Sequence, residues 1–158
     1  MKSIIRFITA AMAILALAAC GTSGKAADQE LSDLAATAFK THDATIEVNY
    51  IYPLEFPARP STDGYTITIK DGKMKGFLPF FGSSSMGGYS PNDGGFTFED
   101  CPVRIKSTKG NDNVVWNFEA KAGTDNVRVS ITIWNNGNAE IYLQPTNKSA
   151  MRYSGELR

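Results

Sequence analysis

Strict alternation of apolar and polar side chains constrains the fold of this chain more than any other feature. Every odd position from Val127 to Ile133 is a branched aliphatic residue, and every even position from Arg128 to Trp134 is polar or aromatic. Successive side chains of a β-strand point to opposite faces, so this period of two predicts a strand with one buried face. Such a strand needs antiparallel neighbours that bury the same face.

The turn that follows fixes the expected pairing on one side of this strand. A two-residue turn at Asn136-Gly137 would set Ile133 opposite Glu140 and mix the two faces. A three-residue loop from Asn135 to Gly137, with Gly137 in the left-handed conformation, keeps one face apolar. We therefore expect three cross-strand pairs: Ile133 with Ala139, Ile131 with Ile141 and Val129 with Leu143.

Three further hairpins are expected on the same grounds. A turn at Gly123-Thr124 predicts four apolar pairs, Ala120–Val127, Phe118–Val129, Trp116–Ile131 and Val114–Ile133, with Glu119 opposite Arg128. A loop over Lys109 to Asp112 sets Ile105 opposite Trp116, and a turn at Asp71-Gly72 sets Ile69 opposite Met74. Shorter strands are expected within residues 45–52, 96–99 and 151–155. The predicted fold class is mainly β, an antiparallel meander of about eight or nine strands closed as a sandwich or an open barrel.

Residues 30–40 predict one N-terminal α-helix. Its apolar positions recur at helical spacing: Leu31, Leu34, Ala35, Ala38 and Phe39. Glu30 and Asp33 near the start and Lys40 at the end suit the helix macrodipole. We expect this helix to cover an edge or an open end of the sheet.

The first 20 residues resemble the signal sequence of a bacterial lipoprotein. Lys2 and Arg6 precede an apolar run over residues 7–17, which is shorter than the about 20 residues that a transmembrane helix needs. Leu17-Ala18-Ala19-Cys20 resembles the lipobox, in which the cysteine thiol receives a diacylglyceryl group. Removal of residues 1–19 would then leave Cys20 with acyl chains such as palmitate, which hold a protein in the membrane. The alternative is an ordinary secretory peptide and a plain thiol at Cys20.

The lipoprotein interpretation implies an order along the chain. Residues 20–29 are small and polar and predict a flexible tether, and residues 30–158 form a single β-rich domain. With Cys20 lipidated, Cys101 has no partner for a disulfide and is expected to be a small buried side chain. Only Asp28 and Glu30 come near Cys20 as acidic residues. We therefore expect the domain to face the periplasm from the outer membrane of a Gram-negative bacterium.

Charge excludes one class of partner. The whole chain has 16 basic and 16 acidic residues, and removal of residues 1–19 would take away Lys2, Arg6 and no acid. The remainder would then carry a net charge of −2, with 14 basic residues against 16 acidic ones. Since no basic excess exists to neutralise a phosphate backbone, we expect no nucleic-acid partner.

Catalytic and metal-binding patterns do not emerge from the sequence. His42 is the only histidine, so neither a histidine metal cluster nor a second histidine for acid–base chemistry exists. Glu99 and Asp100 are adjacent and would point to opposite faces of a strand. The glycine-rich segment 82–88 lacks the Lys-Ser/Thr of a phosphate-binding loop. We expect no catalytic residue, no metal, no cofactor and no enzymatic activity.

A long connection over residues 82–95 suggests a contact region, because loops of this length often bind ligands. Phe80, Phe81 and Tyr89 flank this connection or lie in it, and Trp134 lies on the polar face of its strand. These four residues are our candidates for contact with a protein, glycan or lipid partner. In the alternative interpretation, Phe80 and Phe81 cap the hydrophobic core and the loop crosses one end of the sheet.

Three short segments resemble a known family. They are GFLPFFG at residues 76–82, GGFTFE at residues 94–99 and YSGEL at residues 153–157. Together with the signal and the helix, they resemble the lipoprotein family of domain of unknown function 4251, typical of gut-type Gram-negative anaerobes, over about residues 30–158. The resemblance implies a secreted, lipid-anchored, mostly β domain. It supplies no catalytic residues.

Two functions are therefore expected. The first is a noncatalytic binding or envelope-assembly module, attached to the membrane through acylated Cys20. The alternative is a half-barrel carrier of an apolar ligand or lipid, whose cavity would be lined by Val114, Trp116, Phe118, Val129 and Ile131. Because Trp116 and Phe118 are bulky enough to fill a small barrel, we favour the first.

Overall fold

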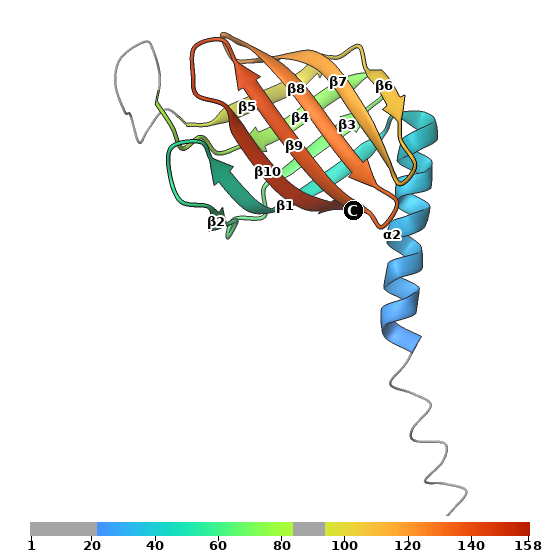
Figure 1. The fold of residues 1–158 in the computed structure, drawn as a ribbon. Helices are drawn as coiled ribbons and strands as arrows, with labels where there is room; N and C mark the ends of the chain where they lie inside the picture. The colour runs from blue at the N-terminus through green and yellow to red at the C-terminus, as the bar shows by residue number, and fades with distance from the viewer. Residues whose placement is uncertain (1–21, 84–93) are drawn as a thin grey trace, which may run out of the picture. The chain divides into compact units, whose positions relative to one another are not determined.

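One antiparallel sheet of ten strands forms the body of the protein (Figure 1). The computed structural model describes residues 22–83 and 94–158, and its contacts divide the chain into residues 1–30 and residues 31–158. The strands are β1 (Ala44–Pro53), β2 (Arg59–Pro60), β3 (Thr66–Lys70), β4 (Lys73–Leu78), β5 (Phe96–Pro102), β6 (Lys106–Lys109), β7 (Asn113–Ala122), β8 (Asp125–Trp134), β9 (Asn138–Pro145) and β10 (Met151–Leu157). The predicted mainly β class is confirmed.

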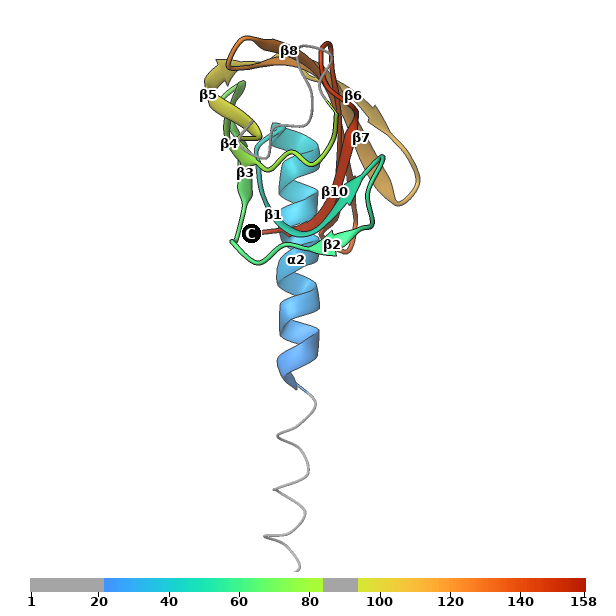
Figure 2. The same ribbon diagram turned by 90° about the vertical axis from the view of Figure 1, so that its left-hand side faces the viewer.

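The order of the strands explains how the sheet closes. It runs β5-β4-β3-β1-β10-β9-β8-β7-β6, and β2 pairs with Tyr50 and Ile51 in the C-terminal half of β1. β5 and β6 follow each other in the chain but occupy opposite edges, so the sheet curls until β5 contacts β7. Figure 2 shows β3, β4 and β5 facing β7 and β10 across the core. Of the two predicted closures, this arrangement is the open barrel.

Three of the four predicted hairpins are confirmed. β8 and β9 pair Ile133 with Ala139 and Ile131 with Ile141, and Gly137 has a positive φ of 80°. β7 and β8 pair Trp116 with Ile131 and set Glu119 opposite Arg128. β3 and β4 pair Ile69 with Met74. In each of these hairpins, a glycine with positive φ allows the turn that keeps the apolar faces together.

The fourth hairpin prediction is wrong by two residues. Ser107 lies opposite Trp116, where Ile105 was expected. The Gly110 N–H donates to Asn113 O at 2.9 Å, so the turn is confined to residues 111–112 and does not extend over Lys109 to Asp112. A shift of two residues leaves each side chain on the same face, and the sequence pattern is therefore insensitive to it. The continuous strand expected from Cys101 is also divided, because residues up to Pro102 pair with β4 at the other edge of the sheet.

The inner face of the sheet is filled by its own side chains. Trp116, Val129 and Ile131 have no accessible surface, Val114 has 1% and Phe118 has 5%. A side chain beside a ligand-sized cavity would retain more accessible surface, so this packing describes a dry core. Cys101 is buried as predicted, with its thiol 3.5 Å from the carbonyl oxygen of Met74.

Helix α2 (Thr22–Thr41) packs its last three turns against this core. Ala35 and Ala38 are each 1% exposed, and their small side chains let the helix approach the sheet closely. The helix ends at Thr41, and His42 after it has a φ of 61° and donates its N–H to Ala38 O. The helix begins eight residues before the expected Glu30, so residues 22–29 of the predicted tether are helical. The division into residues 1–19, 20–29 and 30–158 stays a prediction, and Cys20 lies outside the described residues.

Candidate functional site

The outer face of the sheet carries aromatic side chains that the alternation excludes from the core. Even positions of β8, β9 and β10 point outward, and Figure 1 shows these three strands in front of β3, β4 and β5. In β1 the register shifts between Val48 and Tyr50, and this irregularity places Tyr50 and Tyr52 on the same outer face. We call Tyr50, Tyr52, Tyr142 and Trp134 the aromatic face.

Three tyrosines of the aromatic face surround one arginine. Tyr52 of β1 and Tyr142 of β9 each lie opposite Arg152 of β10. The guanidinium carbon of Arg152 is 4.6 Å from the centroid of the Tyr52 ring, and the Tyr50 ring lies 5.2 Å from the same centroid. Tyr50 and Tyr142 are 37% and 42% exposed. Stacked cations and rings of this kind hold large side chains in place at the surface.

An open groove of about 500 Å³ adjoins these tyrosines. Trp134 is half-buried in its wall, at the end of β8. The polar lining consists of Asn49, Asn136, Asn138, Glu140 and Ser154. Ser154 also connects the groove to the tyrosines, because it lies opposite Tyr50 and its Oγ is 3.4 Å from Tyr52 Oη.

The groove beside Trp134 differs in charge from a second hollow of the protein. Among the residues that the structure describes, Glu140 is the only charged one that lines the groove, and its carboxylate lies 3.6 Å from Arg152. A second hollow, of about 680 Å³, lies by the connection between β5 and β6 and is lined by Arg104, Lys106 and Arg128 together with Glu119. The Trp134 groove therefore suits an uncharged ligand, and the second hollow has a basic lining.

Phe80 and Phe81 pack against the core. The Phe80 ring meets the Phe96 ring edge-on at 5.6 Å, and Arg59 lies 4.3 Å above the Phe81 ring. This packing agrees with the alternative interpretation, in which both side chains cap the core. Their contact with a ligand stays a prediction, and Tyr89 lies outside the described residues.

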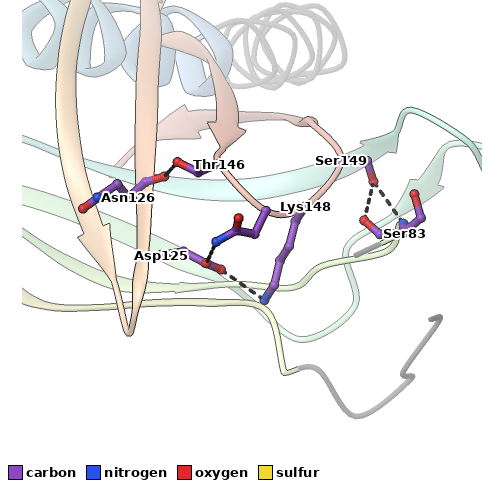
Figure 3. A network of polar contacts seen from close by, with 7 residues as sticks. Ser83, Asp125, Asn126, Thr146, Lys148 and Ser149 are labelled. Atoms are coloured by element: carbon purple, nitrogen blue, oxygen red, sulfur yellow. Dashed lines mark hydrogen bonds and ion pairs between the residues drawn. The ribbon is translucent and has the colours of Figure 1, made fainter. Parts of the chain in front are cut away.

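A polar network holds the end of the sheet near Phe80 (Figure 3). Lys148 Nζ lies 3.6 Å from Asp125 Oδ2 and 5.3 Å from the Phe80 ring centroid. The backbone N–H of Ser149 donates to Ser83 O at 3.0 Å, and Ser149 Oγ accepts from the N–H of Ser83 at 3.1 Å. These contacts fasten the loop after β9 to the first residue of β8 and to Ser83.

The structure does not bring the four predicted contact residues together. Asp125 and Trp134 lie at opposite ends of β8. They are nine residues apart, and at the rise of a β-strand this separation is about 30 Å. Phe80 belongs to the Asp125 end, because Lys148 bridges the two. Trp134 instead lies on the outer face that also carries Tyr50, Tyr52 and Tyr142, three residues that sequence reasoning missed. The alternation could have placed Tyr142 outside, but the pairing of β1 with β10 brings together residues about 100 positions apart, as in the contact between Tyr52 and Ser154.

The site is equipped to hold a ligand. Among the described residues, no three histidine, cysteine or acidic side chains are grouped as a metal site would require. Within the same residues, no helix is long and apolar enough to cross a membrane. The groove offers aromatic surface, amides, one carboxylate and a hydroxyl, which are groups for stacking and hydrogen bonding.

Comparison with known proteins gives a family and a fold. The family model described as a domain of unknown function, DUF4251, matches residues 26–157. The crystal structure of a DUF4251 family protein from Bacteroides eggerthii DSM 20697 is similar to this chain, with a TM-score of 0.63 and 23% sequence identity. The similarity covers 84% of this chain and 89% of that chain. No curated protein matches the chain.

Proposed function

The chain belongs to the DUF4251 family, and from this premise we propose that it is a lipid-anchored binding module of the cell envelope that acts without catalysis. Its partner contacts the aromatic face. The anchor is Cys20, and the domain faces the periplasm from the outer membrane of a Gram-negative bacterium. The family match begins at residue 26, which leaves the lipobox-like segment and a short connection before the domain.

The exposure of large aromatic side chains is the observation that carries the binding role. Tyr50 and Tyr142 are exposed on one face with Arg152 between two tyrosines. Tyrosine, tryptophan and arginine are the side chains most enriched among the residues that contribute most energy at binding surfaces. Tyrosine and tryptophan bury large areas and lose little conformational freedom. Grouped exposed aromatic side chains of this kind are typical of interaction sites.

The packing of the core favours binding outside the sheet over transport of a ligand inside it. A carrier needs a cavity beneath Trp116 and Ile131, and both side chains are fully buried among their neighbours. The support for a noncatalytic role is the composition of the aromatic face, whose polar groups lack a nucleophile paired with a base.

Oxidative footprinting in intact cells tests the proposal. Hydroxyl radicals modify exposed aromatic side chains, and mass spectrometry compares each residue in cells with the same residue in the purified full chain. We expect Trp134, Tyr50 and Tyr142 to be protected in cells, because the partner covers them. Tyr65, which is partly exposed beside β3, is the control and should be modified equally in both samples. If Trp134, Tyr50 and Tyr142 are modified to the same extent in cells as in the purified chain, as Tyr65 is, no partner covers the aromatic face.

A further inference from the structure

We propose that the groove beside Trp134 binds a neutral oligosaccharide. The inference rests on the proposed function, because it gives the aromatic face a ligand of defined chemistry. A groove of about 500 Å³ lies within the range of known small-ligand sites, which is about 300–1,000 Å³.

The polar lining matches the hydrogen-bonding character of a sugar. Each sugar hydroxyl donates one hydrogen bond and accepts others, and each asparagine amide likewise combines donors with an acceptor, two N–H groups and one carbonyl oxygen. Asn49, Asn136 and Asn138 supply three amides to the groove. Asn136 Oδ1 accepts the backbone N–H of Asn138 at 3.1 Å, so its NH₂ group is the part that can reach a ligand. Ser154 and Glu140 add a hydroxyl and a strong acceptor.

The aromatic side chains match the other surface of a sugar. The C–H groups on one side of a pyranose ring are apolar and pack flat against an aromatic ring through dispersion and burial. Trp134 presents such a ring at the groove. Beyond the groove, Tyr50 lies opposite Ser154 and stacks near Tyr52. Because aromatic surface continues past the groove in this way, a chain of sugars fits better than a single one.

Charge and topology argue against other ligands. No cationic side chain lines the groove within residues 22–83 and 94–158, so phosphates and acidic sugars find no counter-charge among them. Arg152 lies 3.6 Å from Glu140 and over the Tyr52 ring, and Arg158 pairs with Glu47 and Glu156, so both guanidinium groups already have partners. A peptide in extended form binds most readily by pairing with a free strand edge. The strands around the groove, β8, β9, β10 and β1, are each paired on both sides.

The test is a glycan array probed with the full chain, followed by isothermal titration calorimetry with the strongest neutral oligosaccharide. The array carries neutral and acidic oligosaccharides of several linkages. We expect neutral members to bind, and Trp134→Ala and Asn138→Leu to weaken the best of them about ten-fold or more. Lys106→Ala, in the basic hollow, is the matched control and should leave the affinity unchanged. Thermal unfolding checks that each variant is folded, and Asn138→Leu keeps the test decisive if Trp134→Ala does not fold.

Several outcomes would overturn the inference. It fails if no neutral oligosaccharide binds at concentrations up to about 10 mM, if acidic members bind in a way that depends on Lys106, or if affinity survives both groove variants. Footprinting separates this failure from failure of the proposed function. Protection of Trp134 in cells without any sugar binding leaves a binding face with a ligand of another class, such as a protein, whereas absence of both results removes both proposals.

Discussion

Tyr153 shows how a single residue connects three distant parts of the chain. Its ring is fully buried, and its hydroxyl donates to the carbonyl oxygen of Pro79 at 2.8 Å. Pro79 stands next to Phe80, whose ring contacts Phe96. Two positions after Tyr153, Gly155 lacks a side chain where a Cβ would overlap the backbone of Glu47 in β1. The three segments that carry the family resemblance therefore meet inside one fold.

Burial of Tyr153 predicts a loss of stability at alkaline pH. Desolvation raises the pKa of its hydroxyl well above the ordinary value of about 10. Above pH 10 the unfolded chain releases this proton and the folded chain keeps it, so the free energy of unfolding falls as pH rises towards the folded-state pKa. Below pH 10 the stabilisation is fully present. Urea unfolding of the native chain and of the Tyr153→Phe variant between pH 7 and about 11 measures how the free energy of unfolding depends on pH.

We expect the Tyr153→Phe variant to be less stable at pH 7 by about 1 kcal/mol, because Pro79 O loses its donor. Its stability should then fall less steeply than that of the native chain above pH 10. If the free energies of unfolding of the two proteins fall in parallel with rising pH across the alkaline range, Tyr153 is not the group that titrates.

At the scale of the elements, the loop between β9 and β10 is fastened by Lys148. This side chain pairs with Asp125 and lies over the rings of Phe80 and Phe96. The two charged side chains are only 13% and 14% exposed, so solvent screens them less than a surface pair. We expect Lys148→Met to lower the free energy of unfolding by about 1–2 kcal/mol, through loss of the ion pair and of both ring contacts.

Lys75 of β4 provides the matched control. It is exposed, and Lys75→Met should change the free energy of unfolding by no more than about 0.5 kcal/mol. Chemical denaturation of both variants makes the comparison. If Lys148→Met is no more destabilising than Lys75→Met, the network in Figure 3 does not hold this end of the sheet.

The alternation of apolar and polar residues predicted the strand pairs well where a short turn joins the two strands. The alternation of β8 and the glycines of its two turns determine the pairs Trp116–Ile131 and Ile131–Ile141. The position of β10 between β1 and β9 has no such signal, because Tyr153 meets Ile51 across about a hundred residues of chain. The aromatic face depends on that pairing. Trp134 could therefore be singled out from the sequence, whereas Asn49 of the same groove and Tyr50 of the same face could not.

At the scale of the whole molecule, the lipobox-like segment predicts attachment to a membrane. In a Gram-negative host, we expect the mature chain to carry acyl chains on Cys20 and to sediment with the outer membrane. Cys20→Ser should abolish acylation and remove the protein from that fraction, because a serine cannot form the thioether. Cys101→Ser is the control, since this buried thiol plays no part in anchoring. Intact mass spectrometry and membrane fractionation decide the matter, and an unlipidated native chain would favour an ordinary secretory signal.

The central claim is that the sheet keeps a filled inner face and binds through its outer face. The chain has two tryptophans, one on each face, so Trp134→Phe leaves the buried Trp116 as the only one. The most direct test is to titrate this variant of the full chain with a brominated fatty acid, which quenches tryptophan fluorescence on contact. We expect Trp116 fluorescence to stay unchanged, because its ring is enclosed by protein side chains. Saturable quenching of Trp116 would show instead that the inner face has a cavity and that the protein is a carrier.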